Sequence, residues 1–226
     1  MSFSRLRVVQ DRSPAAPEQD SDAVLDSQTK SADAASNLLE GLGERAPWAE
    51  RLLVQRYAAV VERILSRILG STAELDDLAQ EVFVRVFDRV ALLRDPQALG
   101  GFVSSITVFV AREAIRAKRR RWWLSLFAAD QPPEVELSGV DPVAREAVRA
   151  FYEVVGKLPD DERIAFCLRY VEGMELSEIA AACETSLSTL KRRLRDAERR
   201  FSRLAGTRAE LSDLMREGSR WPRHAS

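Results

Sequence analysis

From Trp48 onward, large apolar residues recur at intervals of three and four positions. This spacing gathers them on one face of an α-helix, because an α-helix completes a turn every 3.6 residues. One such stripe covers 52–68 and stops before Gly70, a second covers 78–90, and a third helix is predicted from about Phe102 to Trp123. We recognise no two-residue alternation of the kind that half-buried strands show. The pattern therefore predicts an all-α fold.

Two composition breaks divide this helical pattern. The first forty-odd residues are rich in Asp, Ser and Ala, and positions 1–50 carry nine acidic and five basic residues. The paired prolines Pro132 and Pro133 lie in an acidic stretch that is poor in apolar residues, which is typical of an extended linker. We predict a disordered acidic arm (1–44), a first helical domain (45–125), a flexible linker (126–142), a second helical domain (143–206) and a tail (207–226).

Composition excludes several classes of protein. The chain is 46% hydrophobic and 31% charged, which suits small helical domains. Two cysteines and one histidine cannot supply the four ligands of a structural zinc site. We find no glycine-rich phosphate loop and no paired catalytic carboxylates, so we expect no metal, no cofactor and no enzymatic activity. No apolar run approaches the ~20 residues of a membrane span, and the start lacks a signal core, so we expect a cytoplasmic protein without membrane insertion.

The segment 174–201 carries a second, more specific pattern. A short apolar stripe over 176–183 is followed by Glu184, Thr185 and Ser186, and then by a longer stripe over 187–201. Two short amphipathic helices joined by a tight turn form a helix-turn-helix, and Ser186 or Ser188 can cap the second helix. Its polar side is basic, with seven bases and two acids over 191–203. Basic side chains there can reach DNA phosphates or guanine edges; the alternative is a helical hairpin with a solvated basic face.

A first basic island lies in the helix predicted from Phe102, with six bases and one acid over 112–121. Phe109, Arg112, Arg116 and Arg119 fall along one seam of that helix, aromatic at one end and cationic at the other. Arginines can hold backbone phosphates while unpaired bases stack on an aromatic ring. The alternatives are that the phenylalanine completes the core and that the basic run is a solvated helix end.

Two segments carry a resemblance to a known family. They are Asp76-Asp77-Leu78-Ala79-Gln80-Glu81-Val82-Phe83-Val84-Arg85-Val86-Phe87, and the run from Lys157-Leu158-Pro159-Asp160-Asp161-Glu162-Arg163 to Thr189-Leu190-Lys191-Arg192-Arg193-Leu194. Both resemble extracytoplasmic-function (ECF) sigma factors, the dissociable promoter-specificity subunits of bacterial RNA polymerase. The resemblance implies a helical N-terminal sigma-type bundle and a C-terminal helix-turn-helix domain.

The resemblance also implies partners and roles. The partners are core RNA polymerase, through its β′ clamp helices and β flap, promoter DNA, and an anti-sigma factor as a further candidate. The polymerase-binding residues would be Asp77, Gln80 and Glu81. The alternative from the residues alone is ordinary surface charge, with Asp77, Glu81 and Arg85 forming a ladder at four-residue spacing. The downstream element and melted strand would be held by Phe109, Arg112, Arg116, Lys118 and Arg119. The upstream element would be read by Ser188, Thr189, Lys191, Arg192, Arg195 and Arg199.

Two positions depart from the family pattern. Phe109 stands where family members often have asparagine, and Glu184 stands where they often have glycine in the turn. We expect a sigma factor that recognises a two-element promoter and promotes strand opening. The rival interpretations are a helix-turn-helix regulator that never binds polymerase, and a sigma-like protein that sequesters polymerase or an anti-sigma factor.

Overall fold

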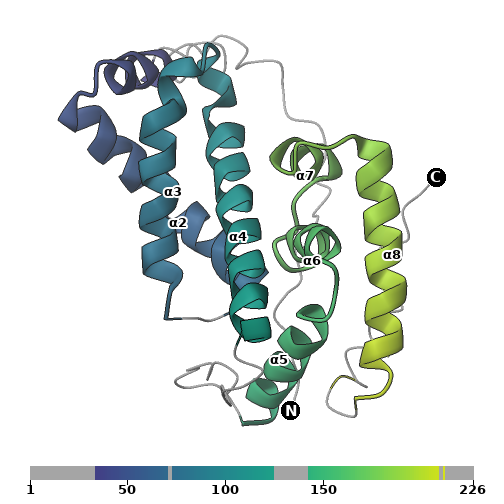
Figure 1. The fold of residues 1–226 in the computed structure, drawn as a ribbon. Coiled ribbons are helices and arrows are strands. Elements are labelled where there is room, and N and C mark those ends of the chain that lie inside the picture. Colours follow the sequence, from purple (N-terminus) through teal and green to yellow (C-terminus); the bar gives the residue numbers. More distant parts are fainter. Residues whose placement is uncertain (1–33, 71–72, 125–141, 209–210, 212–226) are drawn as a thin grey trace, which may run out of the picture.

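The computed structural model describes residues 34–70, 73–124, 142–208 and 211. Its first part is a bundle of three long helices, α2 (Pro47–Leu69), α3 (Leu75–Arg89) and α4 (Leu99–Leu124), with two 3₁₀ turns, η1 (Val90–Leu92) and η2 (Pro96–Ala98), before α4. The three helices contact one another in every pairing, as Figure 1 shows. The predicted flexible linker falls almost wholly on residues outside the described ranges, as does most of the predicted tail.

The ends of α2 follow from simple local rules. Pro47 occupies the first turn, where a missing backbone N–H costs nothing. Gly70 follows the last turn with φ +79°, and its N–H donates to the carbonyl of Ser66. A Cβ at Gly70 would lie 3.3 Å from the ring of Tyr152, a residue of the second domain. Glycine is required here by both the backbone conformation and the close approach.

Part of the predicted N-terminal arm is ordered, which corrects the boundary drawn from composition. Residues 34–43 are helical, and Leu38 and Leu42 are 1% and 3% exposed in the core of the first domain. The helix ends with Arg45 at φ 55°, where the N–H of Ala46 donates to the carbonyl of Gly41. Apolar burial against the bundle stabilises a segment whose own composition does not predict a helix.

The long helix α4 is the centre of the molecule. It contacts α2 and α3 on one side and α6 and α7 on the other. Val108, Ala111 and Ile115 are buried in addition to the stripe that faces the bundle. By length and composition the segment Pro96–Arg121 is apolar enough to span a membrane, contrary to the expectation that no apolar run approaches that length. Its most apolar stretch has a mean hydropathy of 1.4, and 44% of that stretch is buried inside the fold. Its apolar character is that of a helix packed on several sides.

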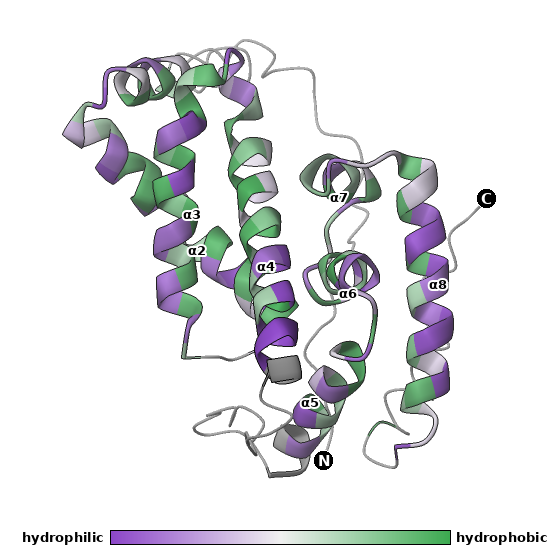
Figure 2. Ribbon diagram, in the orientation of Figure 1, coloured by the Kyte–Doolittle hydropathy of each residue, from purple (hydrophilic) through white to green (hydrophobic). Residues whose placement is uncertain are grey.

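The second domain contains α5 (Pro142–Val155), α6 (Asp160–Phe166), a π-helical turn η4 (Cys167–Val171), α7 (Leu176–Ala182) and α8 (Leu187–Ala205). Aromatic rings fill its centre, and the rings of Phe166 and Phe201 stack at 4.8 Å between centroids. Figure 2 shows α8 as an amphipathic helix, with hydrophobic positions on one side and hydrophilic positions on the other. The described residues contain helices and no strand, so the predicted all-α fold is confirmed.

The turn between α7 and α8 has the geometry of a helix-turn-helix. The N–H of Thr185 donates to the carbonyl of Ala180, and the N–H of Glu184 donates to that of Ala181, which is the Schellman pattern. Ser186 caps α8, since its hydroxyl accepts from the N–H of Thr189 at 3.2 Å. Of the two serines proposed as caps, the structure selects Ser186.

Candidate nucleic-acid interface

The outward face of α8 is basic and free of internal ion pairs at three positions. Lys191, Arg192 and Arg195 are exposed, and none of them forms an ion pair within the described ranges. Arg199 continues this face and pairs with Asp196 at 2.5 Å, with 76% of its side chain exposed. Three guanidinium groups and one ammonium therefore point away from the domain core, in a geometry that can contact a phosphate backbone.

Two other bases of the same island turn inward. Arg193 pairs with Asp161 at 2.7 Å, and Arg200 pairs with Glu162 at 3.0 Å. Burial raises the pKa of Glu162, and the Arg200 charge opposes that rise. The sequence shows one uniform basic run. In the structure, Arg193 and Arg200 bind carboxylates of α6 and fix α8 on that helix, whereas the other bases described above point outward.

The first turn of α8 places small polar groups at its exposed end. Ser188 is exposed, and its hydroxyl lies 3.0 Å from that of Ser186. Thr189 is half-buried and its hydroxyl accepts from Ser186 at 2.9 Å. The positive end of the helix dipole lies at this turn, which favours an approaching phosphate. The six residues predicted for the upstream element thus lie on one helix, with Thr189 the least accessible.

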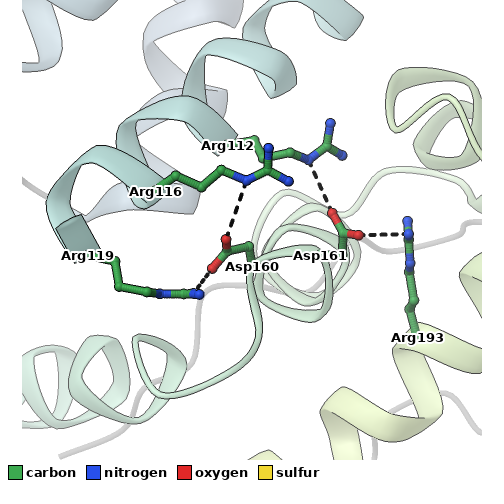
Figure 3. Close-up of polar contacts among 6 residues, drawn as sticks. All are labelled: Arg112, Arg116, Arg119, Asp160, Asp161 and Arg193. Carbon is green, nitrogen blue, oxygen red and sulfur yellow. Dashed lines mark hydrogen bonds and ion pairs between the residues drawn. The ribbon is translucent and has the colours of Figure 1, made fainter.

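Arg112, Arg116 and Arg119 lie on one face of α4, as the seam predicts, and that face is turned toward the second domain (Figure 3). Arg112 pairs with Asp161 at 3.1 Å, Arg116 approaches Asp160 at 3.8 Å, and Arg119 also pairs with Asp160. Asp161 is shared with Arg193 of α8, so one carboxylate joins α4, α6 and α8. The sequence predicts these arginines as a set but does not predict the carboxylates that meet them.

The other two residues predicted for the melted strand, Phe109 and Lys118, have different neighbours from these arginines. Phe109 is 39% exposed, and the guanidinium of Arg85 from α3 stands over its ring at 5.1 Å from the centroid. Phe109 is therefore not a core residue, and one face of its ring is covered by a cation. Partial burial, followed by the charges of Arg163 and Arg121, lowers the pKa of Lys118.

The exposed face of α3 carries the residues predicted to bind polymerase. Asp77 and Gln80 are exposed, while Glu81 binds Arg85 at 2.5 Å, and Arg85 also pairs with Glu113 at 2.7 Å. A groove of about 540 Å³ runs between α3 and α4 beside this face. Its charged lining residues are Glu74, Asp77, Glu81, Glu113, Arg116, Arg120 and Arg121. The part of the predicted ladder that joins Glu81 to Arg85 is thus present, and Asp77 and Gln80 remain open to a partner.

Sequence reasoning missed the residues that join the two domains. Arg163 is largely buried and donates to the carbonyl of Ile68 through Nε at 2.9 Å and a terminal nitrogen at 2.8 Å. Glu172, whose side chain is 9% exposed, pairs with Arg63 and approaches Arg67 at 4.0 Å. No local spacing marks either residue for this role, because their partners on α2 lie 95 and 109 positions away in the sequence.

The two cysteines take no part in these surfaces. Burial raises the pKa of Cys167 to about 12, against the opposing charge of Arg163, and burial raises that of Cys183 to about 11. Both thiols are therefore neutral at physiological pH and behave as small apolar residues.

The fold and its surfaces define a two-domain helical DNA-binding protein with a helix-turn-helix in its second domain. Comparison with known families extends this. The model of sigma-70 region 2 matches residues 53–123, and the model of sigma-70 region 4 matches residues 148–201. The first match covers most of α2, all of α3 and nearly all of α4, and the second includes the helix-turn-helix.

Individual relatives agree with these matches. A probable RNA polymerase sigma factor, RfaY, of Xanthomonas campestris is 31% identical over 139 residues, which are 59% of this chain and 34% of that protein. The ECF RNA polymerase sigma-E factor of Escherichia coli K12 is 27% identical over 155 residues, which are 65% of this chain and 81% of that protein. The chain thus spans about a third of the Xanthomonas relative and most of the Escherichia one.

Two solved structures share the fold. One is CnrH in complex with the cytosolic domain of CnrY, with a TM-score of 0.54, 18% identity, and coverage of 76% of this chain and 97% of that one. The other is the sigma factor RpoE with the anti-sigma factor NepR from Bartonella quintana, with a TM-score of 0.53, 16% identity, and coverage of 70% and 97%. The chain belongs to the sigma-70 family, as an ECF sigma factor.

Proposed function

We propose that this ECF sigma factor binds core RNA polymerase through its first domain, reads an upstream promoter element with α8 and holds the opened strand with α4. The observation that carries the proposal is the separation of charge between the two domains. Exposed Asp77 and Gln80 lie on α3, whereas Lys191, Arg192 and Arg195 lie on α8. One surface suits a basic protein partner and the other suits a polyanion.

The polymerase contact is assigned to the exposed face of α3. Asp77 and Gln80 can meet basic side chains of the β′ clamp helices directly. Glu81 contributes mainly by fixing Arg85, because its carboxylate already accepts from that guanidinium at 2.5 Å. The groove between α3 and α4 lies beside this face, and Asp77, which lines it, forms no ion pair within the described ranges. Complementary charge speeds association.

The promoter contacts are assigned to the two basic faces. On α8, Ser188 and Thr189 would meet phosphates at the helix start, while Lys191, Arg192, Arg195 and Arg199 would contact base edges and backbone. The domain that carries α8 would dock on the β flap.

On α4, Arg112, Arg116 and Arg119 would hold phosphates of the melted strand, and Lys118 would add charge from a neighbouring face. Phe109 would offer its uncovered ring face to an unpaired base.

Other aspects of the function follow from this assignment. The chain would act by binding and without catalysis of its own, in the cytoplasm where polymerase works. Its first domain would begin before residue 45, since residues 34–43 pack on the bundle, and its second domain would occupy 143–206. An anti-sigma factor is a further proposed partner, because the RpoE structure was solved with one.

Runoff transcription with core enzyme on a library of promoter sequences tests the proposal. The wild-type chain should direct transcripts from a defined promoter class. The variant Asp77→Lys should lose about tenfold in affinity for core enzyme, since reversed charge repels a basic partner. Glu62→Lys, at an exposed glutamate of α2, makes the same change of charge and is the matched control, which should keep its affinity. Equal core binding by all three proteins would contradict the proposal.

A further inference from the structure

The phosphate-binding face proposed for α4 is occupied within the chain itself. Arg112, Arg116 and Arg119 stand on successive turns of α4, and each meets a carboxylate of Asp160 or Asp161 at the start of α6 (Figure 3). The side chain of Asp160 is only 13% exposed and serves two of these arginines. This is a shared, partly buried cluster, which holds its geometry better than an isolated surface pair.

Carboxylates and phosphates compete for the same arginine donors. Both are anionic oxygen acceptors, and a guanidinium binds either through the same N–H groups. While the acids of α6 accept from the arginines of α4, α6 and α7 also cover that side of the helix. The Arg112 side chain is only 20% exposed, while those of Arg116 and Arg119 are 58% and 52% exposed, so a strand of DNA cannot engage all three arginines unless the second domain moves away.

A second set of contacts holds the domains in this position, at the C-terminal end of α2. Arg163 donates twice to the carbonyl of Ile68, and the hydroxyl of Tyr152 donates to that of Ser66 at 3.3 Å. Glu172 pairs with Arg63 on the same helix. These groups bind helix-end carbonyls and charged side chains, which water and salt can also serve, so the contact can open.

The DNA-facing surface of α8 stays accessible in this closed arrangement. Lys191, Arg192 and Arg195 remain exposed on the far side of α8. The closed molecule can therefore present its recognition helix while its strand-holding helix is covered. We propose that the α4–α6 contact is an autoinhibitory closure, in which Asp160 and Asp161 occupy the phosphate sites of α4 until the domains separate. This inference rests on the proposed role of α4 in strand capture.

The test compares full-length variants in two measurements. The first is the affinity for a fluorescein-labelled single-stranded DNA oligonucleotide, measured by anisotropy. The second is the distance between the domains, measured by energy transfer between dyes on introduced cysteines, Val84→Cys and Ser202→Cys, at exposed positions of α3 and α8. Both native thiols are buried and stay unlabelled.

Asp160→Asn with Asp161→Asn should lengthen the distance and tighten single-strand binding. If about 90% of the wild-type molecules are closed, the gain is about tenfold, because apparent affinity scales with the open fraction. Glu172→Gln should shift both readouts in the same direction, although it touches none of the arginines of α4. Glu44→Gln with Glu62→Gln removes the same charge as the double variant at exposed sites of the first domain and should change neither readout appreciably.

An unchanged distance, or a gain in affinity no larger than that of the control, would overturn the closure. Transcription by the wild-type chain would then leave the proposed function standing. A failure of the proposed strand capture by α4 is tested separately, by adding Arg116→Ala and Arg119→Ala to the variant with Asp160→Asn and Asp161→Asn. Unweakened DNA binding there would remove α4 from strand capture, and the closure would lose its function with it.

Discussion

At the turn between α7 and α8, a glutamate holds a backbone conformation that glycine adopts more easily. Glu184 has φ 50°, in the left-handed region, and occupies the position where a helix of this type commonly ends with glycine. The sequence pointed to this position through a departure from the family pattern. The structure gives the reason, because the Schellman hydrogen bonds of Glu184 and Thr185 require the left-handed residue.

We therefore expect Glu184→Gly to raise the free energy of unfolding by up to about 1 kcal/mol, since relief of the left-handed strain exceeds the entropy that glycine loses. Thermal unfolding followed by circular dichroism measures the change. Thr185→Gly is the matched control, because its φ is not positive, and it should lower stability. A lower melting temperature for Glu184→Gly would show that the turn is unstrained.

At the scale of the element, α8 divides its bases by direction. Residues on its inner side form the core contact at Leu190, Leu194 and Phe201, and Arg200 at its edge is held by Glu162. Lys191, Arg192 and Arg195 form no ion pair of this kind within the described ranges. Charge alone therefore does not identify the DNA contacts, because bases of equal charge differ in what they already bind.

This division predicts different effects for equal losses of charge. Arg195→Ala should weaken binding to an upstream-element duplex and reduce the slope of log affinity against log salt concentration by about one, because one phosphate contact is lost. Arg200→Ala should leave that slope almost unchanged. Fluorescence anisotropy over a salt series measures both. Equal slopes for the two variants would place the DNA on another face of α8.

At the scale of the whole molecule, the two domains pack directly and share polar contacts. Arg163 joins them through the carbonyl of Ile68, and burial lowers the pKa of its guanidinium, against the neighbouring polar and acidic groups. A buried cation that bonds a helix-end carbonyl stabilises the closed arrangement more than an exposed pair would.

Arg163→Met should therefore uncouple the domains. Loss of a charged hydrogen bond to Ile68 removes about 2 kcal/mol of interdomain stability. Calorimetry should therefore show two unfolding transitions for the variant and one for the wild-type chain. Arg169→Met is the control, because Arg169 donates to the carbonyl of Met174 within the second domain. It should lower the transition without splitting it. A single transition for Arg163→Met would mean that other contacts carry the coupling.

Much of the fold could be predicted from the sequence, because helix periodicity and capping depend on residues close together in the chain. Helix periodicity located α2, α3, α4 and α8, and the cap at Ser186 was one of two serines proposed. The helix at 34–43 was missed, because its stability comes from burying Leu38 and Leu42 against the bundle. The helical period alone likewise did not predict that Val108 and Ile115 of α4 are buried, because their burial comes from the helices that pack around α4.

The sequence by itself determined the helical periodicity, the basic helix-turn-helix and the grouping of Arg112, Arg116 and Arg119, because these depend on neighbours within a few turns of one helix. Tertiary structure alone decided what those groups meet. Asp160 lies more than forty positions from Arg116, and only the packing of α6 on α4 brings them together. The charge pattern along the chain identifies residues that can form ion pairs. Which residues they pair with depends on long-range packing, which local spacing does not encode.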